Sequence, residues 1–347
     1  MKKILILGIN GFIGNQLTKK ILLATDWEIY GMDLASNKLA HSIKNPKLHF
    51  TEGDITINKE WVSYHIKKCD VVLPLVAIAT PATYVTDPLR VFELDFEANL
   101  PIIRQCVQFK KKLVFPSTSE VYGMSPDKEF DEETSPLMQG PINKERWIYS
   151  CSKQLLDRII YAYGKRDGLK FTLFRPFNWI GPTQDDIHNL PPGGVRVITQ
   201  FISNIFYGRD IQLVDGGKQK RSFTYIDDAI EALFKIIENK DNCTDGKIFN
   251  IGNPKNNASI GEIAHKIFEL AKNYPKYKAN LKKIKIINTP SKKYYGGGYQ
   301  DVEHRVPSIK RAQETLNWKP KTNLDEALKK TVEYYLKRRP ERSEGSP

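Results

Sequence analysis

The sequence has 347 residues, 40% hydrophobic and 27% charged, with a formal net charge of +13. These values describe an ordinary soluble globular protein, and no apolar run approaches the roughly 20 residues that span a bilayer. Four cysteines without CxxC spacing and six scattered histidines argue against a disulfide framework or a metal site. This cysteine usage fits a reducing cytoplasm, where we expect the protein to lie.

The positive charge is compatible with nucleic acid, with an anionic small molecule, or with lysines spread over solvated surfaces. The lysine clusters are short and scattered, no basic stretch is interleaved with aromatic residues, and no nucleic-acid-binding motif is present. We therefore interpret most of the charge as solvated surface and expect neither nucleic acid nor a membrane as a partner. A pocket for an anionic ligand is compatible with this interpretation.

In the N-terminal half, short apolar runs alternate with amphipathic stretches, as in the βαβ units of a parallel sheet. Residues 3–8 are predicted to form a buried strand rather than a signal sequence, because the run is brief and leads into a glycine loop. A helix is predicted from Gly11 to about Leu23. Later strands are predicted over residues 28–32, 48–52, 71–75, 112–116 and 172–175.

Beyond Gly181 the pattern is less regular. Helices are predicted near residues 196–206 and 226–239, loops at 191–194 and 215–221, and no regular element in the glycine-rich stretch 294–299. We predict an α/β fold, a Rossmann-type doubly wound parallel sheet with a smaller C-terminal substrate-binding lobe. The predicted sheet domain spans residues 1–176 with part of 220–252 returning to it, the lobe mainly 177–335, and a polar tail 336–347.

The loop Gly8-Ile9-Asn10-Gly11-Phe12-Ile13-Gly14 follows the first predicted strand and opens the first helix. Gly8 allows a tight turn, Gly11 lets the backbone approach a pyrophosphate, and Gly14 permits close helix–strand packing, so phosphates would sit at the helix N-terminus. Asp33 is placed to bind both ribose hydroxyls and would repel a 2′-phosphate, which favours NAD over NADP. The predicted cofactor site is Gly8, Gly11, Phe12, Ile13, Gly14 and Asp33, with Asp54 and Ile55 near the adenine.

Tyr149 and Lys153 form a Tyr-x-x-x-Lys pair on one helix face. A tyrosine with its ordinary pKa of about 10 is a poor base at neutral pH, but the lysine charge and that of the oxidised nicotinamide would favour the phenolate. Taken alone, the pair is common and could be a surface tyrosine beside a solvated lysine. Behind the glycine loop, it predicts an oxidoreductase.

The segment Ser117-Thr118-Ser119-Glu120 follows the predicted strand 112–116, so its hydroxyls should lie at the carboxyl edge of the sheet, where doubly wound folds bind ligands. With the glycine loop and the Tyr/Lys pair, the chain resembles the extended short-chain dehydrogenase/reductase family over nearly its full length. The family implies Thr118 as the hydroxyl partner of Tyr149 and Lys153.

Longer strings at residues 146–149, 174–179, 214–221 and 299–305 narrow the resemblance. They are similar to the UDP-glucuronic acid decarboxylase domain of the bifunctional polymyxin-resistance protein ArnA, which acts in lipopolysaccharide modification; UDP-apiose/UDP-xylose synthase is a near relative. The resemblance implies Glu120 and Arg305 as acid/base groups, with Ser119 beside the sugar carboxylate. It implies a UDP-sugar pocket formed by Ala79, Tyr84, Arg146, Asn178, Arg196, Lys218, Arg221 and Tyr299.

Departures from the relatives refine the prediction. Sugar-nucleotide 4,6-dehydratases carry Asp-Glu where this chain has Ser119-Glu120, so the proton donor that expels a 6-hydroxyl is missing. Apiose-forming relatives carry cysteines in place of Ala79 and Ser119, which argues against ring contraction, and Gln212 stands where the ArnA domain has a lysine.

The predicted function is the NAD-dependent oxidative decarboxylation of UDP-glucuronate to a UDP-4-keto-pentose, by a homodimer or higher homo-oligomer. Four alternatives stay open. Three are enzymes: a UDP-xylose synthase, a UDP-apiose/UDP-xylose synthase and a UDP-sugar 4-epimerase. The fourth is a non-enzymatic regulator that senses a dinucleotide.

Overall fold

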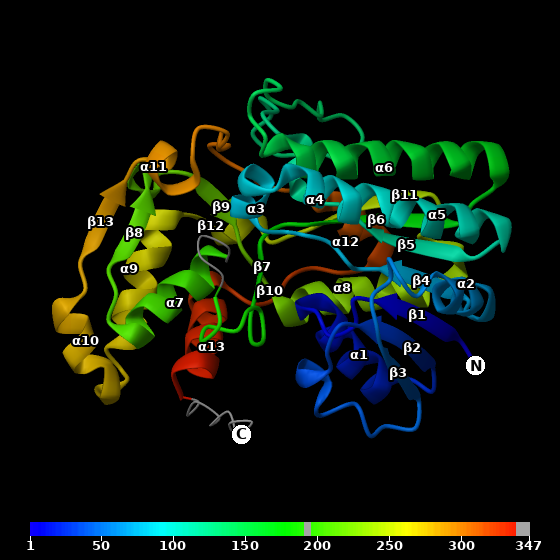
Figure 1. Ribbon diagram of the computed structural model, residues 1–347, viewed down its shortest axis with the longest axis horizontal. Helices are drawn as coiled ribbons and strands as arrows, with labels where there is room; N and C mark the ends of the chain where they lie inside the picture. Colours follow the sequence, from blue (N-terminus) through cyan, green and yellow to red (C-terminus); the bar gives the residue numbers. More distant parts are fainter. Residues whose placement is uncertain (191–195, 338–347) are drawn as a thin grey trace.

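A seven-stranded parallel sheet forms the centre of the computed structural model, which describes residues 1–190 and 196–337 (Figure 1). The strand order is β11-β6-β5-β4-β1-β2-β3, so the direction of winding reverses between β1 and β4. In open α/β sheets such a reversal leaves a crevice at the carboxyl ends of the strands, where ligands bind. The strands are β1 (Lys3–Leu7), β2 (Glu28–Asp33), β3 (Leu48–Glu52), β4 (Val71–Pro74), β5 (Lys112–Pro116), β6 (Phe171–Pro176) and β11 (Lys247–Ile251).

Helices cover both faces of this sheet, which explains why its strands are nearly continuous apolar runs. Successive side chains of β1 alternate between two cores: Ile4 and Ile6 face one, Leu5 and Leu7 the other. The first core includes helices α1 (Phe12–Ala24) and α8 (Ile226–Glu238). The second includes α2 (Lys59–Lys68), α5 (Asn99–Gln108) and α6 (Trp147–Asp167), and the two sets lie on opposite sides of the sheet in Figure 1.

A smaller lobe lies beside the carboxyl edge of the sheet (Figure 1). Its helix α9 begins at a capping box, in which Ser259 and Glu262 each accept the other's backbone N–H. The lobe has helices α7 (Val197–Tyr207), α9 (Ile260–Ala271), α10 (Lys278–Lys283), α11 (Ser291–Tyr295) and α13 (Leu324–Lys337) and the parallel strands β8 (Ile211–Val214) and β13 (Ile286–Thr289).

Short elements complete the fold. The strand pairs are β7 (Trp179–Ile180) with β10 (Thr224–Tyr225), which is parallel, and β9 (Lys220–Ser222) with β12 (Asn257–Ser259), which is antiparallel. The helices are α3 (Pro81–Thr86), α4 (Pro88–Phe92), a π-helical turn (Glu93–Glu97) and α12 (Lys310–Leu316). Short 3-10 turns occur at Asn37–Leu39, Ser119–Tyr122, Asp215–Gly217, Lys240–Asn242, Pro254–Asn256 and Pro275–Tyr277.

The predicted fold class is confirmed, and every predicted strand and helix in the described residues lies within one residue of its predicted bounds. Three local predictions were wrong. The loop predicted at 215–221 contains a 3-10 turn and the start of β9, and Tyr294 and Tyr295 close helix α11. Residues 336 and 337, predicted to belong to the polar tail, lie in α13, where buried Leu336 packs into the core. The predicted loop 191–194 and tail residues 338–347 lie outside the described residues.

Across residues 1–190 and 196–337, no helix is long and apolar enough to cross a membrane. Within the same ranges, no three His, Cys, Asp or Glu side chains are grouped as metal ligands would be. All four cysteines are free thiols.

Candidate active site

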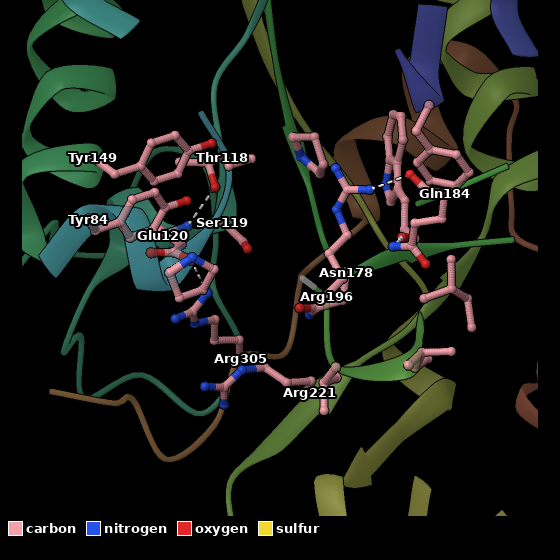
Figure 2. Close-up of a pocket in the computed structure, with 18 of the residues that line it drawn as sticks. Tyr84, Thr118, Ser119, Glu120, Tyr149, Asn178, Gln184, Arg196, Arg221 and Arg305 are labelled. Atoms are coloured by element: carbon pink, nitrogen blue, oxygen red, sulfur yellow. Dashed lines mark hydrogen bonds and ion pairs between the residues drawn. The ribbon is translucent and has the colours of Figure 1, made fainter. Parts of the chain in front are cut away.

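A cavity of about 440 Å³ opens where the carboxyl edge of the sheet meets the lobe. Figure 2 shows Tyr149, Thr118 and Glu120 on one wall, with Arg196 and Asn178 on the wall opposite. The cavity brings together most of the predicted site residues: Gly8, Gly11, Phe12, Ile13, Gly14, Ala79, Tyr84, Thr118, Ser119, Glu120, Arg146, Tyr149, Lys153, Asn178, Arg196, Arg221, Tyr299 and Arg305. It does not include Asp33, Asp54, Ile55 or Lys218.

The glycine loop has the close packing that a dinucleotide site requires. Gly8 has φ +84°, a left-handed conformation that favours glycine. A Cβ atom on Gly14 would lie 2.6 Å from the carbonyl oxygens of Gly8 and Ile9, so a larger residue would push helix α1 away from β1. Gly11 precedes α1 without a side-chain cap, which leaves the first N–H groups of the helix free for phosphate oxygens.

Asp33 lies directly beside this loop. One carboxylate oxygen accepts the backbone N–H of Asn10 at 2.8 Å, and the other accepts that of Leu34 at 2.8 Å. Burial raises the pKa of this carboxyl, and the backbone hydrogen bonds partly offset that effect. Asp33 therefore ties β2 to the glycine loop, and its contact with a ribose stays a prediction.

Asp54, Ile55 and Lys218 have other surroundings. Asp54 accepts hydrogen bonds from the backbone N–H and the hydroxyl of Thr56, both at 2.7 Å, and so closes a turn. Ile55 is buried in the core on the α2 side of the sheet. Lys218 is exposed, and Gln212 and Gln219 line the cavity near it. Proximity of Asp54 and Ile55 to adenine, and contact of Lys218 with substrate, remain predictions.

Tyr149 and Lys153 enter the cavity from helix α6, and both are buried. Burial, followed by the carboxylates of Asp95 and Glu120, raises the pKa of the Tyr149 hydroxyl, while hydrogen bonding with Thr118 lowers it. The Lys153 ammonium approaches the ring of Phe115 at 4.9 Å and has no hydrogen-bond partner among the described residues. A buried donor without a partner fits a ligand hydroxyl, such as that of a nicotinamide ribose.

The ring of Tyr84 stacks on that of Tyr149, with centroids 4.7 Å apart and planes inclined by 7°. Tyr84 comes from α3 and is fully buried. Since the stack restricts rotation of the Tyr149 ring, it holds the Tyr149 hydroxyl at the cavity wall.

Glu120 forms an ion pair with each of two arginines. Its two oxygens lie 2.6 Å from Nη2 of Arg146 and 3.3 Å from Nη1 of Arg305. Burial raises the pKa of Glu120, but the guanidinium groups outweigh it and hold that pKa below its usual value. Buried nitrogens on both arginines, Nε and Nη1 of Arg146 and Nε of Arg305, have no partner among the described residues. The cluster therefore retains donors for an anionic ligand.

Three further predicted residues are anchored around the cavity. Arg221 donates to Asp301 at 2.5 Å and to the carbonyl oxygen of Val302 at 2.8 Å. Asn178, with φ +41°, donates to the carbonyl of Ser222 at 3.2 Å. Arg196 donates to the carbonyl of Gln184 and to Asp185 (Figure 2 shows Gln184 beside it).

Sequence reasoning missed two acidic residues of this region. Asp301 lines the cavity, and Arg221, followed by Arg305, overcomes burial to hold its pKa low. It lay within the string 299–305, so the motif could have revealed it. Asp95 is fully buried near Lys153, and no motif in the sequence could have revealed it.

Comparison with known proteins places these features in a family. The model of the NAD dependent epimerase/dehydratase family matches residues 4–252. The crystal structure of PbgP3 protein from Burkholderia pseudomallei is 57% identical, with a TM-score of 0.89 over 97% of this chain and 96% of that one.

More distant structures share the fold. UDP-glucuronic acid 4-epimerase from Bacillus cereus is 22% identical, with a TM-score of 0.78 over 96% of this chain and 99% of that one. A dTDP-glucose 4,6-dehydratase from Bacillus anthracis is 22% identical, with a TM-score of 0.77 over 97% of each chain. The predicted cofactor, NAD, is confirmed by the family match, and the glycine loop and the unpartnered Lys153 ammonium fit it. The chain belongs to the NAD dependent epimerase/dehydratase family.

Proposed function

We propose that the protein catalyses the NAD-dependent oxidative decarboxylation of UDP-glucuronate. The observation that carries this proposal is the Glu120–Arg146–Arg305 cluster in the same cavity as Tyr149 and Lys153. Unpartnered guanidinium nitrogens suit a carboxylate, which arginine binds with two parallel hydrogen bonds. A sugar that carries a carboxylate at C5 would therefore be held beside the groups that oxidise C4.

NAD supplies the hydride acceptor when it is bound. Tyr149 removes the proton of the sugar C4 hydroxyl, assisted by the hydrogen bond with Thr118. Because burial raises the pKa of Tyr149, its ionisation needs a nearby positive charge, a role that we assign to Lys153 on the same helix. The stacked ring of Tyr84 keeps the phenol oriented toward the cavity.

Oxidation at C4 places a ketone β to the carboxylate. The C5–C6 bond then breaks, carbon dioxide leaves, and the electron pair enters an enolate at C4–C5. A proton returns to C5, delivered with the help of Glu120 or Arg305, which form an ion pair at 3.3 Å. Because Glu120 is held ionised, it needs to take up a proton before it can donate one.

A UDP-sugar 4-epimerase is the second candidate. It uses the same Tyr149 and Lys153 chemistry, and the Bacillus cereus fold neighbour is an epimerase in complex with UDP-glucuronic acid and NAD. A carboxylate pocket is therefore compatible with both activities, and the fate of carbon C6 separates them. A dinucleotide-sensing regulator would bind NAD without turnover.

The test incubates the purified protein with NAD and UDP-glucuronate labelled with ¹³C at C6, and follows NADH absorbance, labelled carbon dioxide and product mass. We expect release of the label. NADH that accumulates with a keto-pentose identifies the oxidative decarboxylase, and UDP-xylose without net NADH identifies a synthase. Epimerised UDP-glucuronate that retains the label would replace the proposal by the epimerase. Light scattering on the same sample tests the predicted homo-oligomer.

A further inference from the structure

The π-helical turn Glu93–Glu97 carries a buried carboxylate into the protein between α4 and α5. Asp95, in the middle of this turn, is 0% exposed. Its Oδ1 accepts the backbone N–H of Ile78 at 2.7 Å, and its Oδ2 has no hydrogen-bond partner among the described residues. A buried carboxylate is costly unless a positive charge compensates it, and π-helical turns occur often at functional sites.

Lys153 is a buried cation whose ammonium, like the Oδ2 atom of Asp95, lacks a hydrogen-bond partner among the described residues. Its side chain is 1% exposed. Burial lowers the pKa of Lys153, while the charges of Asp95 and then Asp157 raise it. In a medium of low dielectric constant, charges separated by more than 4 Å still interact strongly.

Asp157 already has another cation. It lies one helical turn after Lys153, 3.4 Å from Nη2 of Arg175, and accepts the hydroxyl of Ser117 at 2.6 Å. The other titratable groups that interact with Asp95 are the hydroxyls of Tyr149 from α6 and Tyr84 from α3, and neither is a cation. The π-helical turn that carries Asp95 packs against α6, the helix that carries Lys153. These two buried charges thus lie on adjoining elements and are left to compensate each other.

We propose that Asp95 is the buried counter-ion of Lys153 and keeps the ammonium charged and oriented toward the cavity. This inference rests on the proposed roles of Tyr149 and Lys153 in proton transfer. The carboxylate of Asp95 by itself opposes ionisation of Tyr149. Its contribution to catalysis therefore passes through Lys153, which makes Asp95 a positioning residue.

The first test is a thermal-stability cycle that needs no substrate. Lys153→Met leaves Asp95 as a lone buried charge, so we expect a lower Tm at pH 7. Adding Asp95→Asn keeps an acceptor for Ile78 but removes the charge, so the double variant should regain roughly 3 °C or more. Asp157→Asn in the Lys153→Met background is the matched control; it deprives Arg175 of its carboxylate and should lower Tm further. If Asp95→Asn also lowers Tm in the Lys153→Met background, Asp95 is not the counter-ion of Lys153.

The second test is the pH profile of NADH formation by Asp95→Asn. Without its counter-ion, buried Lys153 loses its proton at lower pH, so the alkaline limb should move down. A shift of one pKa unit lowers kcat about tenfold above the new limb. KM for UDP-glucuronate should stay within about twofold, because Asp95 does not line the cavity. An unmoved alkaline limb would overturn the proposal.

The two tests separate this inference from the proposed function. If UDP-glucuronate keeps its carboxylate but the double variant regains stability, the decarboxylase proposal is wrong and the counter-ion proposal is supported. The limb shift can then be measured with whichever UDP-sugar the enzyme oxidises. If carbon dioxide is released but the double variant does not regain stability, the decarboxylase proposal stands and the counter-ion proposal is wrong.

Discussion

Two walls of the cavity offer ligands different kinds of hydrogen-bond donor. The wall formed by the glycine loop offers backbone N–H groups at the start of α1 and little side-chain charge. The wall around Glu120 offers the guanidinium groups of Arg146 and Arg305, held in ion pairs and partly unsatisfied. The first wall depends on the close approach of backbone to ligand, whereas the second depends on which charges face the sugar.

The first kind of wall is common to dinucleotide-binding folds, whereas the second kind would distinguish one sugar substrate from another. A backbone site recognises the phosphates that all dinucleotides share. A cluster of three arginines and two carboxylates, with Arg221 and Asp301 as its outer pair, retains excess positive charge for an anionic sugar nucleotide. Changes on the first wall should therefore weaken cofactor binding, and changes on the second should alter the reaction.

The largest effect is expected at Tyr149, which lies on the same wall as Glu120 (Figure 2). Tyr149→Phe removes the hydroxyl that we propose takes the C4 proton, so hydride transfer should fall about 10³-fold. The phenyl ring can still stack on Tyr84, so NAD affinity, measured by calorimetry, should change little. Near-normal turnover would remove Tyr149 from the mechanism.

Arg305→Lys tests the charged wall. Lysine keeps the positive charge but cannot hold a carboxylate through two parallel hydrogen bonds, so we expect carbon dioxide release to slow about 100-fold with unchanged NAD affinity. Arg311→Lys is the matched control, because Arg311 pairs with Glu133 outside the cavity. An equal effect of both substitutions would contradict the role of Arg305.

Gly14→Ala tests the backbone wall. The added Cβ would lie 2.6 Å from two carbonyl oxygens, which should cost about 1–3 kcal/mol and loosen the loop. Weaker NAD binding is expected in a titration, with the substrate specificity kept. Gly297→Ala, where a Cβ meets nothing within 4 Å, serves as the control. Unaltered NAD affinity in Gly14→Ala would show that the loop tolerates displacement.

The smallest effect concerns pH. The pKa of Glu120 is lowered in the folded state, so its ion pairs add stability above its ordinary value of 4.5, and that stability is lost as pH falls through the folded pKa. Glu120→Gln removes this contribution. Urea titrations measure the difference in free energy of unfolding between wild type and variant. This difference should be largest at pH 7 and smaller at acid pH. A difference that does not change with pH would contradict the ion pairs.

The sheet could be predicted because its signals are local. Apolar runs such as residues 3–7 are buried on both faces, and glycine at position 14 reports a close packing distance within a short stretch of chain. The lobe gave weaker signals, since β8, β9, β12 and β13 have three or four residues each and pair across long sequence separations.

The site was only partly predictable for the same reason. The family resemblance brought Glu120, Arg146 and Arg305 into one site, but their ion pairs depend on three segments that meet only in the folded chain. Asp95 lacked a motif, and its burial depends on a π-helical turn that a regular helical period does not anticipate. Neither the pairing of charges nor their degree of burial can be read from spacing.

The double ion pair of Glu120 has a consequence for selectivity. In the free enzyme this carboxylate already pairs with one nitrogen of each guanidinium group, while other nitrogens of both arginines have no partner among the described residues. Under the proposed function, a uronate bound to these nitrogens would weaken the hold of both arginines on Glu120, whereas a neutral hexose would not. We expect the enzyme to select acidic sugars less through tight ground-state binding than through their capacity to release Glu120 from its partners.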